Sequence, residues 1–167
     1  MAKHRKKIIT VAVSGGFDPI HPGHIRLIHE AKKLGDKLVV ILNNDNWLKQ
    51  KKGYVFMNEK ERQEVIQALR DVDKVFLTNH KPHPKDMSVS DALQKLKPDI
   101  FANGGDRNKK DAANPKSSLY KDITTCQQNG IKMVYSIGPG GKVQSSSWLL
   151  GNFIKVFPKT KQSQKKK

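Results

Sequence analysis

The sequence is short of cysteine, of acidic residues and of long apolar runs, and each shortage excludes a class of protein. The single thiol, Cys126, cannot form an internal disulfide or a cysteine zinc cluster, so we expect a cytoplasmic protein. Apolar runs such as residues 37–42 are too short to span a bilayer, which predicts no membrane-spanning segment. Residues 8–13 follow a basic N-terminus, contain Thr10 and run into glycines. We interpret them as a first strand rather than the core of a signal peptide.

The shortage of acidic residues, 15 against 32 basic ones, gives a formal net charge of +17. Such a charge suggests nucleic acid as a partner, but its distribution argues against one. Much of the excess lies in residues 1–7 and 158–167, which contain no acid. We interpret these ends as a basic N-terminal extension and a Lys-rich C-terminal tail in solvent. The body, residues 8–157, is then one domain whose smaller positive charge suits a cleft for polyphosphate.

Short apolar segments alternate with amphipathic ones along this body. Strands are expected over residues 8–14, 37–43, 74–78, 99–102 and 132–137, and helices over residues 24–34, 58–69, 88–96, 115–128 and 145–157. Alternation of this kind predicts right-handed crossovers and a parallel sheet covered on both faces. The predicted fold is therefore α/β, a single Rossmann-like domain with a doubly wound, five-stranded parallel sheet. In such sheets, ligands bind beyond the carboxyl ends of the strands.

The loop after the first expected strand combines glycines with two histidines. Gly15 and Gly16 allow the backbone to approach a ligand closely. The next helix begins in the same stretch, so its free N–H groups and dipole favour an anion there. His21 and His24 flank that helix start, with Gly23 between them, and imidazoles can donate hydrogen bonds to phosphate oxygens. The loop predicts a polyphosphate cradle; the alternative is a tight turn with a histidine cap.

Residues 15–24, Gly-Gly-Phe-Asp-Pro-Ile-His-Pro-Gly-His, resemble the G-[TS]-F-D-x-x-H-x-G-H loop of the cytidylyltransferase-like nucleotidyltransferases. The chain departs from that pattern at Gly16, where a hydroxyl residue is usual. Within the superfamily, residues 8–157 are most similar to the glycerol-3-phosphate cytidylyltransferases. The resemblance implies in-line attack by an acceptor phosphate on the α-phosphorus of a nucleoside triphosphate. It also implies that the loop binds the nucleotide, through Gly15, Gly16, Phe17, His21, Pro22, Gly23 and His24.

A lysine-rich segment follows the second expected strand. Three lysines within four residues can neutralise phosphate, although such runs are more often solvated loops. Residues 49–54, Lys-Gln-Lys-Lys-Gly-Tyr, resemble the Lys-Gln-Lys-Lys-x-Tyr segment of the glycerol-3-phosphate enzymes. This implies Lys49 as a ligand of the acceptor phosphate and Lys51 as a catalytic ligand of the triphosphate, beside the two histidines. Residues 70–75 resemble a family segment that often lies at a dimer contact, so a homodimer is expected.

Two later loops complete the predicted site. Residues 102–107, Ala-Asn-Gly-Gly-Asp-Arg, resemble the Gly-Asp stretch near the nucleotide base, which implies a role for Asp106; the alternative is a simple turn. Ser145, Ser146 and Ser147 open the last expected helix. One hydroxyl can cap a helix, but three in succession suit an anion, and they correspond to the family segment that grips the triphosphate. The arginine usually found upstream is missing, and only Lys142 supplies charge there.

The expected reaction is transfer of CMP from CTP to a phosphorylated polyol, sugar or aminoalcohol, with release of pyrophosphate. Mg²⁺ is expected on the triphosphate, because no carboxylate cluster indicates a protein metal site, and Asp18 is interpreted as a loop-shaping residue. One alternative is an adenylyltransferase that uses ATP, of the mononucleotide or pantetheine-phosphate type, because residues 17–24 also resemble the loop of nicotinate-mononucleotide adenylyltransferases. Another is an inactive, basic nucleic-acid-binding relative, against which the intact pair of histidines argues.

Overall fold

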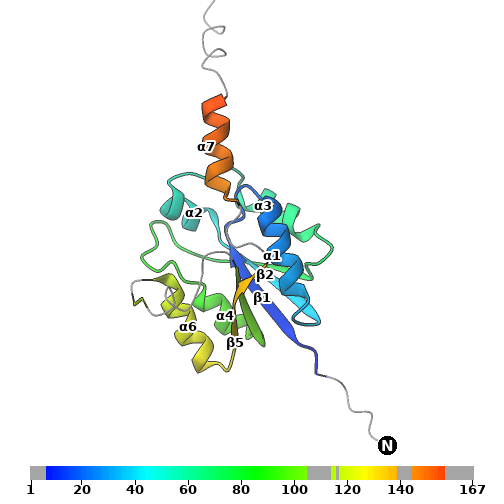
Figure 1. Cartoon of the computed structure of the whole chain (residues 1–167). Helices are drawn as coiled ribbons and strands as arrows, with labels where there is room; N and C mark the ends of the chain where they lie inside the picture. Colours follow the sequence, from blue (N-terminus) through cyan, green and yellow to red (C-terminus); the bar gives the residue numbers. More distant parts are fainter. Residues whose placement is uncertain (1–6, 105–113, 116, 139–143, 157–167) are drawn as a thin grey trace, which may run out of the picture.

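The computed structural model describes residues 7–104, 114–115, 117–138 and 144–156 (Figure 1). Its strands are β1 (Thr10–Gly15), β2 (Lys37–Leu42), β3 (Lys74–Leu77), β4 (Ile100–Gly104) and β5 (Lys132–Ile137). Its helices are α1 (Pro22–Lys32), α2 (Asp45–Lys52), α3 (Glu59–Gln67), α4 (Ser90–Leu96), α6 (Ser118–Gln128) and α7 (Ser146–Val156).

The strands form one parallel sheet in the order β3-β2-β1-β4-β5. β1 lies at the centre, and its Val11, Ala12 and Val13 have no exposed surface. A strand covered on both faces reads as a continuous apolar run, which is how residues 11–13 appear in the sequence. The chain leaves β1 toward β2 and β3, and returns on the other side to β4 and β5. The predicted doubly wound α/β fold is confirmed, and its switch point lies at the carboxyl end of β1.

Two apolar cores hold the layers together. On one face, Val11 and Val13 pack with Ile28 and Ala31 of α1 and Ile66 of α3. On the other face, the core consists of Ala12, Ile41, Val89, Ala92, Leu93, Phe101, Cys126 and Ile131. Burial raises the pKa of the Cys126 thiol to about 12, so this cysteine is a packing residue rather than a nucleophile.

The structure differs most from the expected elements after β2, where α2 replaces an expected loop. The side chain of Asn44 accepts a hydrogen bond from the backbone N–H of Trp47, and Gly53 ends the helix with φ 80°. These are ordinary capping residues. The helix has only 8 residues. Its apolar face consists of Trp47 and Leu48 alone, and the lysines that follow make the segment look like a polar loop in the sequence. The helix expected over residues 58–69 is present as α3, and Asn58 and Glu61 form a capping box at its start.

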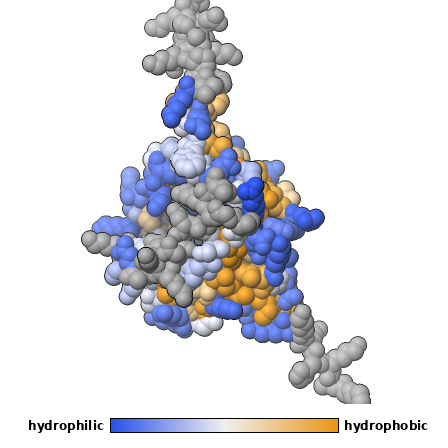
Figure 2. All heavy atoms as spheres, in the orientation of Figure 1, coloured by the Kyte–Doolittle hydropathy of each residue, from blue (hydrophilic) through white to orange (hydrophobic). Residues whose placement is uncertain are grey.

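α7 extends away from the sheet at the end of the described chain (Figure 1). Its start is fixed, because the buried Ser146 hydroxyl donates to the carbonyl oxygen of Pro19 at 2.9 Å. Further along, Trp148, Phe153 and Ile154 are exposed, and Figure 2 shows apolar residues among hydrophilic ones on this helix. None of the described helices has the length and apolar character needed to cross a bilayer.

Candidate active site

The glycine loop lies at the end of β1, against α2. A Cβ atom on Gly16 would lie 2.7 Å from Leu48 Cδ2, closer than non-bonded carbon atoms approach, so a larger residue would require the buried Leu48 side chain to move. This gives a structural reason for the missing hydroxyl residue at position 16. A Cβ atom on Gly23 would lie 2.9 Å from the His21 ring. Glycine at position 23 therefore leaves room for that imidazole to fold over the start of α1.

Asp18 shapes the loop from inside. Its carboxylate has no exposed surface, and it accepts hydrogen bonds from the backbone N–H groups of Phe56 at 2.8 Å and Met57 at 2.7 Å. A buried carboxylate held in this way is fully used by the fold. The geometry is that of the loop-shaping role interpreted from the sequence.

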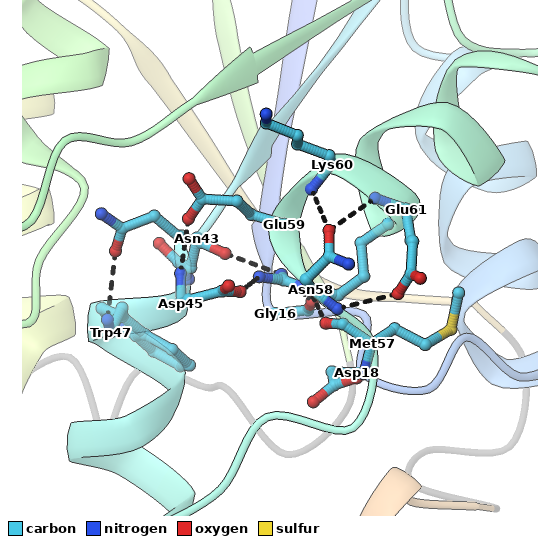
Figure 3. Close-up of polar contacts among 12 residues, drawn as sticks. Gly16, Asp18, Asn43, Asp45, Trp47, Met57, Asn58, Glu59, Lys60 and Glu61 are labelled. Atoms are coloured by element: carbon cyan, nitrogen blue, oxygen red, sulfur yellow. Dashed lines mark hydrogen bonds and ion pairs between the residues drawn. The ribbon is translucent and has the colours of Figure 1, made fainter.

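Arg62 of α3 joins the loop to the neighbouring strand. Its side chain is 1% exposed, and Nη1 donates to the carbonyl oxygens of Gly16 and Asn43, both at 2.7 Å. Nε donates to Met57 at 2.9 Å, and Nη2 pairs with the Asp45 carboxylate at 2.6 Å. These partners, labelled in Figure 3, come from the loop after β1, the stretch from the end of β2 to the start of α2, and the stretch just before α3. The sequence predicted no role for Arg62.

The two histidines stack on each other at the start of α1, with ring centroids 3.7 Å apart and planes at 24°. His21 caps the helix: its Nδ1 accepts from the backbone N–H of Gly23 at 3.1 Å. His24 Nδ1 accepts from the backbone N–H of His21 at 3.3 Å, and Phe17 contacts the His24 ring by its edge. Because both Nδ1 atoms are acceptors, each neutral ring carries its proton on Nε2. Nε2–H is therefore the group that each histidine can offer to a ligand.

Both imidazoles are neutral at physiological pH. Burial, with the nearby His21 and Lys52, lowers the pKa of His24 to about 3. Burial and Lys52 also lower the pKa of His21. A bound anion would oppose these effects, because negative charge close to an imidazole favours its protonated form. The pair is thus arranged to donate hydrogen bonds and to gain positive charge as an anion binds or develops beside it.

The lowered pKa of His24 predicts a pH-dependent stability. In the unfolded chain this imidazole takes up a proton near pH 6.5, whereas in the folded chain it stays neutral down to about pH 3. Between these values the unfolded state binds more protons, so the free energy of unfolding falls as the pH is lowered. Between pH 7.5 and pH 5, this group alone accounts for about 2 kcal/mol. Urea unfolding of the wild type and of His24→Asn at these two pH values measures the effect.

The variant is expected to lose less stability than the wild type over this interval. Carboxyl groups contribute little to the difference: hydrogen bonds from His29 and Lys32 hold the pKa values of Asp71 and Asp73 below their ordinary range. Their stabilisation is lost only below pH 4, as the pH falls through those values. An equal loss in both proteins would contradict the neutral state of the half-buried His24.

A cavity of about 550 Å³ opens over the loop at the carboxyl edge of the sheet. It is lined by residues that come from β1 and the following loop, α1, α2, the ends of β4 and β5, and the start of α7. Of the residues predicted for the site, ten line it: Gly15, Gly16, Phe17, His21, Gly23, His24, Lys51, Ser145, Ser146 and Ser147. Pro22 and Lys49 are not among its lining residues. Asp106 and Lys142 lie outside the described residues.

The lysine-rich turn of α2 contributes differently from what its resemblance implies. Lys51 lines the cavity with an exposed side chain, whereas Lys49 is exposed elsewhere on the helix. Lys52, for which the sequence predicted no role, also lines the cavity and donates to the carbonyl oxygen of Asp18 at 2.7 Å. Burial lowers its pKa, and the Asp18 charge opposes that shift. Had residues 45–52 been recognised as a helix, its period would have placed Lys51 and Lys52 one turn after the apolar residues Trp47 and Leu48, and Lys49 on a different side.

The three serines lie together at the cavity, but two of them already serve the fold. Ser145 Oγ accepts from the backbone N–H of Trp148 at 3.2 Å, as a helix cap does. Ser146 anchors α7 to Pro19. Ser147 is exposed. A phosphate at this helix start would thus meet backbone N–H groups and the Ser147 hydroxyl first.

The remaining lining residues were not predicted from the sequence. They are Ser14, Arg26, Leu27, Trp47, Lys52, Gly104, Ile137, Gly138, Gln144 and Trp148. None of the described lining residues is acidic. Over the described ranges, no group of three or more His, Cys, Asp or Glu side chains is placed to hold a metal ion. The site is therefore cationic and rich in hydrogen-bond donors, as a polyphosphate site requires.

Comparison with known proteins defines the family. The model of a family described as cytidylyltransferase-like matches residues 12–135, which include the glycine loop, both histidines and the lysines of α2. The chain belongs to the cytidylyltransferase-like family. It is therefore a member of the nucleotidyltransferase superfamily, as its resemblance implied.

Two archaeal relatives of this cytidylyltransferase-like protein are named FAD synthase. The chain is 40% identical over 98 residues to that of Ferroglobus placidus, which is 59% of this chain and 60% of the relative. It is 41% identical over 109 residues to that of Pyrococcus horikoshii, which is 65% of this chain and 69% of the relative. The matches thus span 60% of the first relative's length and 69% of the second's, and leave the rest of each uncovered.

Two solved structures resemble the fold. A lipopolysaccharide core biosynthesis protein from Thermoplasma volcanium superposes with a TM-score of 0.62 at 27% identity, covering 80% of this chain and 100% of that one. A pantoate-beta-alanine ligase from Francisella tularensis superposes with a TM-score of 0.55 at 18% identity, covering 89% of this chain and 67% of that one. The second likeness concerns the fold alone.

Proposed function

We propose that this protein is an adenylyltransferase that forms FAD by transferring AMP from ATP to the phosphate of FMN. The observation that carries the proposal is the 41% identity to a protein named FAD synthase over 109 residues, on a chain with an intact histidine loop. It favours the ATP alternative over the CTP reaction expected from residues 49–54. The described lining residues also offer the neutral and cationic donors that a triphosphate needs.

The proposed chemistry is a single in-line displacement. An oxygen of the FMN phosphate attacks the α-phosphorus of ATP, forming one P–O bond. The bond from that phosphorus to the bridging oxygen of the β-phosphate breaks, and pyrophosphate leaves. No covalent nucleophile of the protein is needed, so catalysis depends on alignment and on stabilising charge that develops on the phosphate oxygens.

The histidines and lysines divide this work by position. His21 and His24 offer Nε2–H groups beside the start of α1, whose dipole also favours the anion. Lys51 and Lys52 face the same cavity from α2. Lys52 is the better fixed of the two, because its ammonium is held on the carbonyl oxygen of Asp18. We assign the histidine pair and Lys52 to the transferring phosphate, and Lys51 to the outer phosphates.

Mg²⁺ belongs to this scheme as part of the substrate. The described lining residues include no carboxylate. Within the described chain, no third metal-ligating side chain lies close enough to the two histidines to complete a metal site. The protein's residues thus fit the magnesium complex of ATP rather than a resident ion. When bound, the ion neutralises charge on the phosphates that leave.

A cytidylyltransferase acting on a small phosphorylated alcohol is the second candidate, favoured by residues 49–54. Pyrophosphate release decides between the two when ATP or CTP is combined with FMN, glycerol 3-phosphate or no acceptor. The proposal predicts release only with ATP and FMN. Release only with CTP and glycerol 3-phosphate would replace the proposed reaction. Salt-dependent RNA binding without release in any mixture would favour the inactive relative.

The homodimer expected from residues 70–75 remains part of the proposal. In this segment, Asp71 accepts from His29 and Asp73 pairs with Lys32, so both carboxylates bind their own chain. The Arg70 side chain pairs with Asp71 at 3.5 Å but remains 88% exposed, so a second copy can contact it. Light scattering coupled to gel filtration would measure the mass of the particle directly.

A further inference from the structure

Both tryptophans of the sequence line the cavity, but in different ways. Trp47 of α2 is 9% exposed, and its indole N–H donates to the carbonyl oxygen of Met87 at 2.9 Å. It is a buried wall with its polar group satisfied. Trp148 of α7 is 62% exposed. Tryptophan side chains are usually much less exposed in a folded chain. The exposed indole at this cavity is therefore a candidate contact for a bound ligand.

The position of Trp148 relative to the phosphate cradle is fixed by the start of α7. Ser146 ties that start to the histidine loop through Pro19. The backbone N–H of Trp148 bonds to the carbonyl oxygen of Ser145 at 3.0 Å and to its hydroxyl at 3.2 Å. The indole therefore lies within one helical turn of the three serines. Because Trp148 lines the same cavity as the serines and the histidines, a nucleotide whose phosphates lie between them can place its base beside this ring.

An indole recognises a base by its face and not by its hydrogen-bonding edge. Stacking depends on the area of overlap, so the two fused rings of a purine gain more from it than the single ring of a pyrimidine. An exposed indole therefore suits adenine better than cytosine.

We propose that Trp148 is the stacking platform for the adenine of bound ATP and the source of a preference for purine over pyrimidine nucleotides. This inference rests on the proposed function, because it concerns the nucleotide half of the same site. The isoalloxazine ring of FMN is the competing occupant, and the experiment below distinguishes it from adenine.

The test measures nucleotide affinity without an acceptor, so that no turnover occurs. MgATP and MgCTP are titrated calorimetrically into the wild type, Trp148→Ala, Trp148→Phe and Phe153→Ala. Trp148→Ala is expected to weaken ATP about tenfold while CTP changes by less than about threefold, and Trp148→Phe is expected to retain most of the ATP affinity. Phe153 is exposed on the same helix but is not a lining residue, so Phe153→Ala should bind both nucleotides like the wild type.

Intrinsic fluorescence supplies a second reading, because only two tryptophans contribute. MgATP is expected to quench the wild type, and Trp148→Phe is expected to lose most of that quenching. An equal loss of ATP and CTP affinity in Trp148→Ala would overturn the inference and leave the proposed function standing. Quenching of Trp148 by FMN alone, and not by MgATP, would also overturn it. A wild type that binds CTP but not ATP would instead overturn the proposed function.

Discussion

The His24→Asn variant is expected to lower kcat for nucleotidyl transfer by about 10²-fold or more, the usual cost of removing one donor from a developing oxyanion. Asparagine keeps an oxygen near the position of Nδ1, which accepts the backbone N–H of His21, but it has no Nε2–H at the far side of the ring. The loss should therefore appear in turnover, while the melting temperature at pH 7.5 stays close to that of the wild type. Steady-state kinetics and thermal unfolding measure the two effects.

The matched control is His29→Asn, on the same helix. His29 is exposed, pairs with Asp71 at 2.8 Å and does not line the cavity, so its replacement should leave kcat within about twofold. A His24→Asn enzyme with near wild-type kcat would remove the histidine loop from the catalytic account. A fall in kcat that tracks a lower melting temperature would instead indicate a structural role.

The Lys52→Met variant is expected to lower kcat/KM by about 10²-fold, because a fixed cation next to the transferring phosphate is lost. Methionine retains the apolar stem of the side chain, which limits the effect on packing. The Asp18 carbonyl loses its donor, a change of about 1 kcal/mol in the free energy of unfolding. Kinetics with MgATP and FMN, together with urea unfolding, separate these contributions.

Two further variants serve as a control and a comparison for Lys52→Met. Lys60→Met removes an exposed cation from α3, away from the lining residues, and should leave kcat/KM within about twofold. Lys51→Met should raise the KM for ATP more than it lowers kcat, because an exposed, mobile cation contributes mainly to binding. If Lys51→Met has the larger effect on kcat and Lys52→Met has almost none, the two assignments must be exchanged.

The sheet and the histidine loop could be predicted because their signals are local. The apolar runs of β1 and β2 are buried on both faces, and a strand buried in this way consists of consecutive apolar residues that are visible in the sequence. The Gly-Gly-Phe-Asp-Pro-Ile-His-Pro-Gly-His string lies between a strand and a helix, so its place at the carboxyl edge of the sheet followed from the alternation alone.

What the sequence left open depends on contacts between distant segments. Arg62 is buried where it donates to the carbonyl groups of Gly16 and Asn43. These partners are distant in sequence, so the residues of α3 alone do not predict the contact. The choice between Lys49, Lys51 and Lys52 depends on the direction of a short helix that was expected to be a loop. Trp148 is exposed because α7 extends away from the sheet. The spacing of apolar residues in α7 does not specify that direction. Asp106 and Lys142, outside the described residues, remain predictions.

The measurement that tests the central claim most directly follows the α-phosphate of ATP. The protein is incubated with FMN and MgATP labelled on the α-phosphorus, and the flavins are separated by chromatography. The account predicts labelled FAD, in equal amount to the pyrophosphate released, and labelling about 10²-fold slower when the His24→Asn variant replaces the wild type. If the label never enters FAD, while labelled CTP transfers its α-phosphate to glycerol 3-phosphate, the adenylyl-transfer account is contradicted.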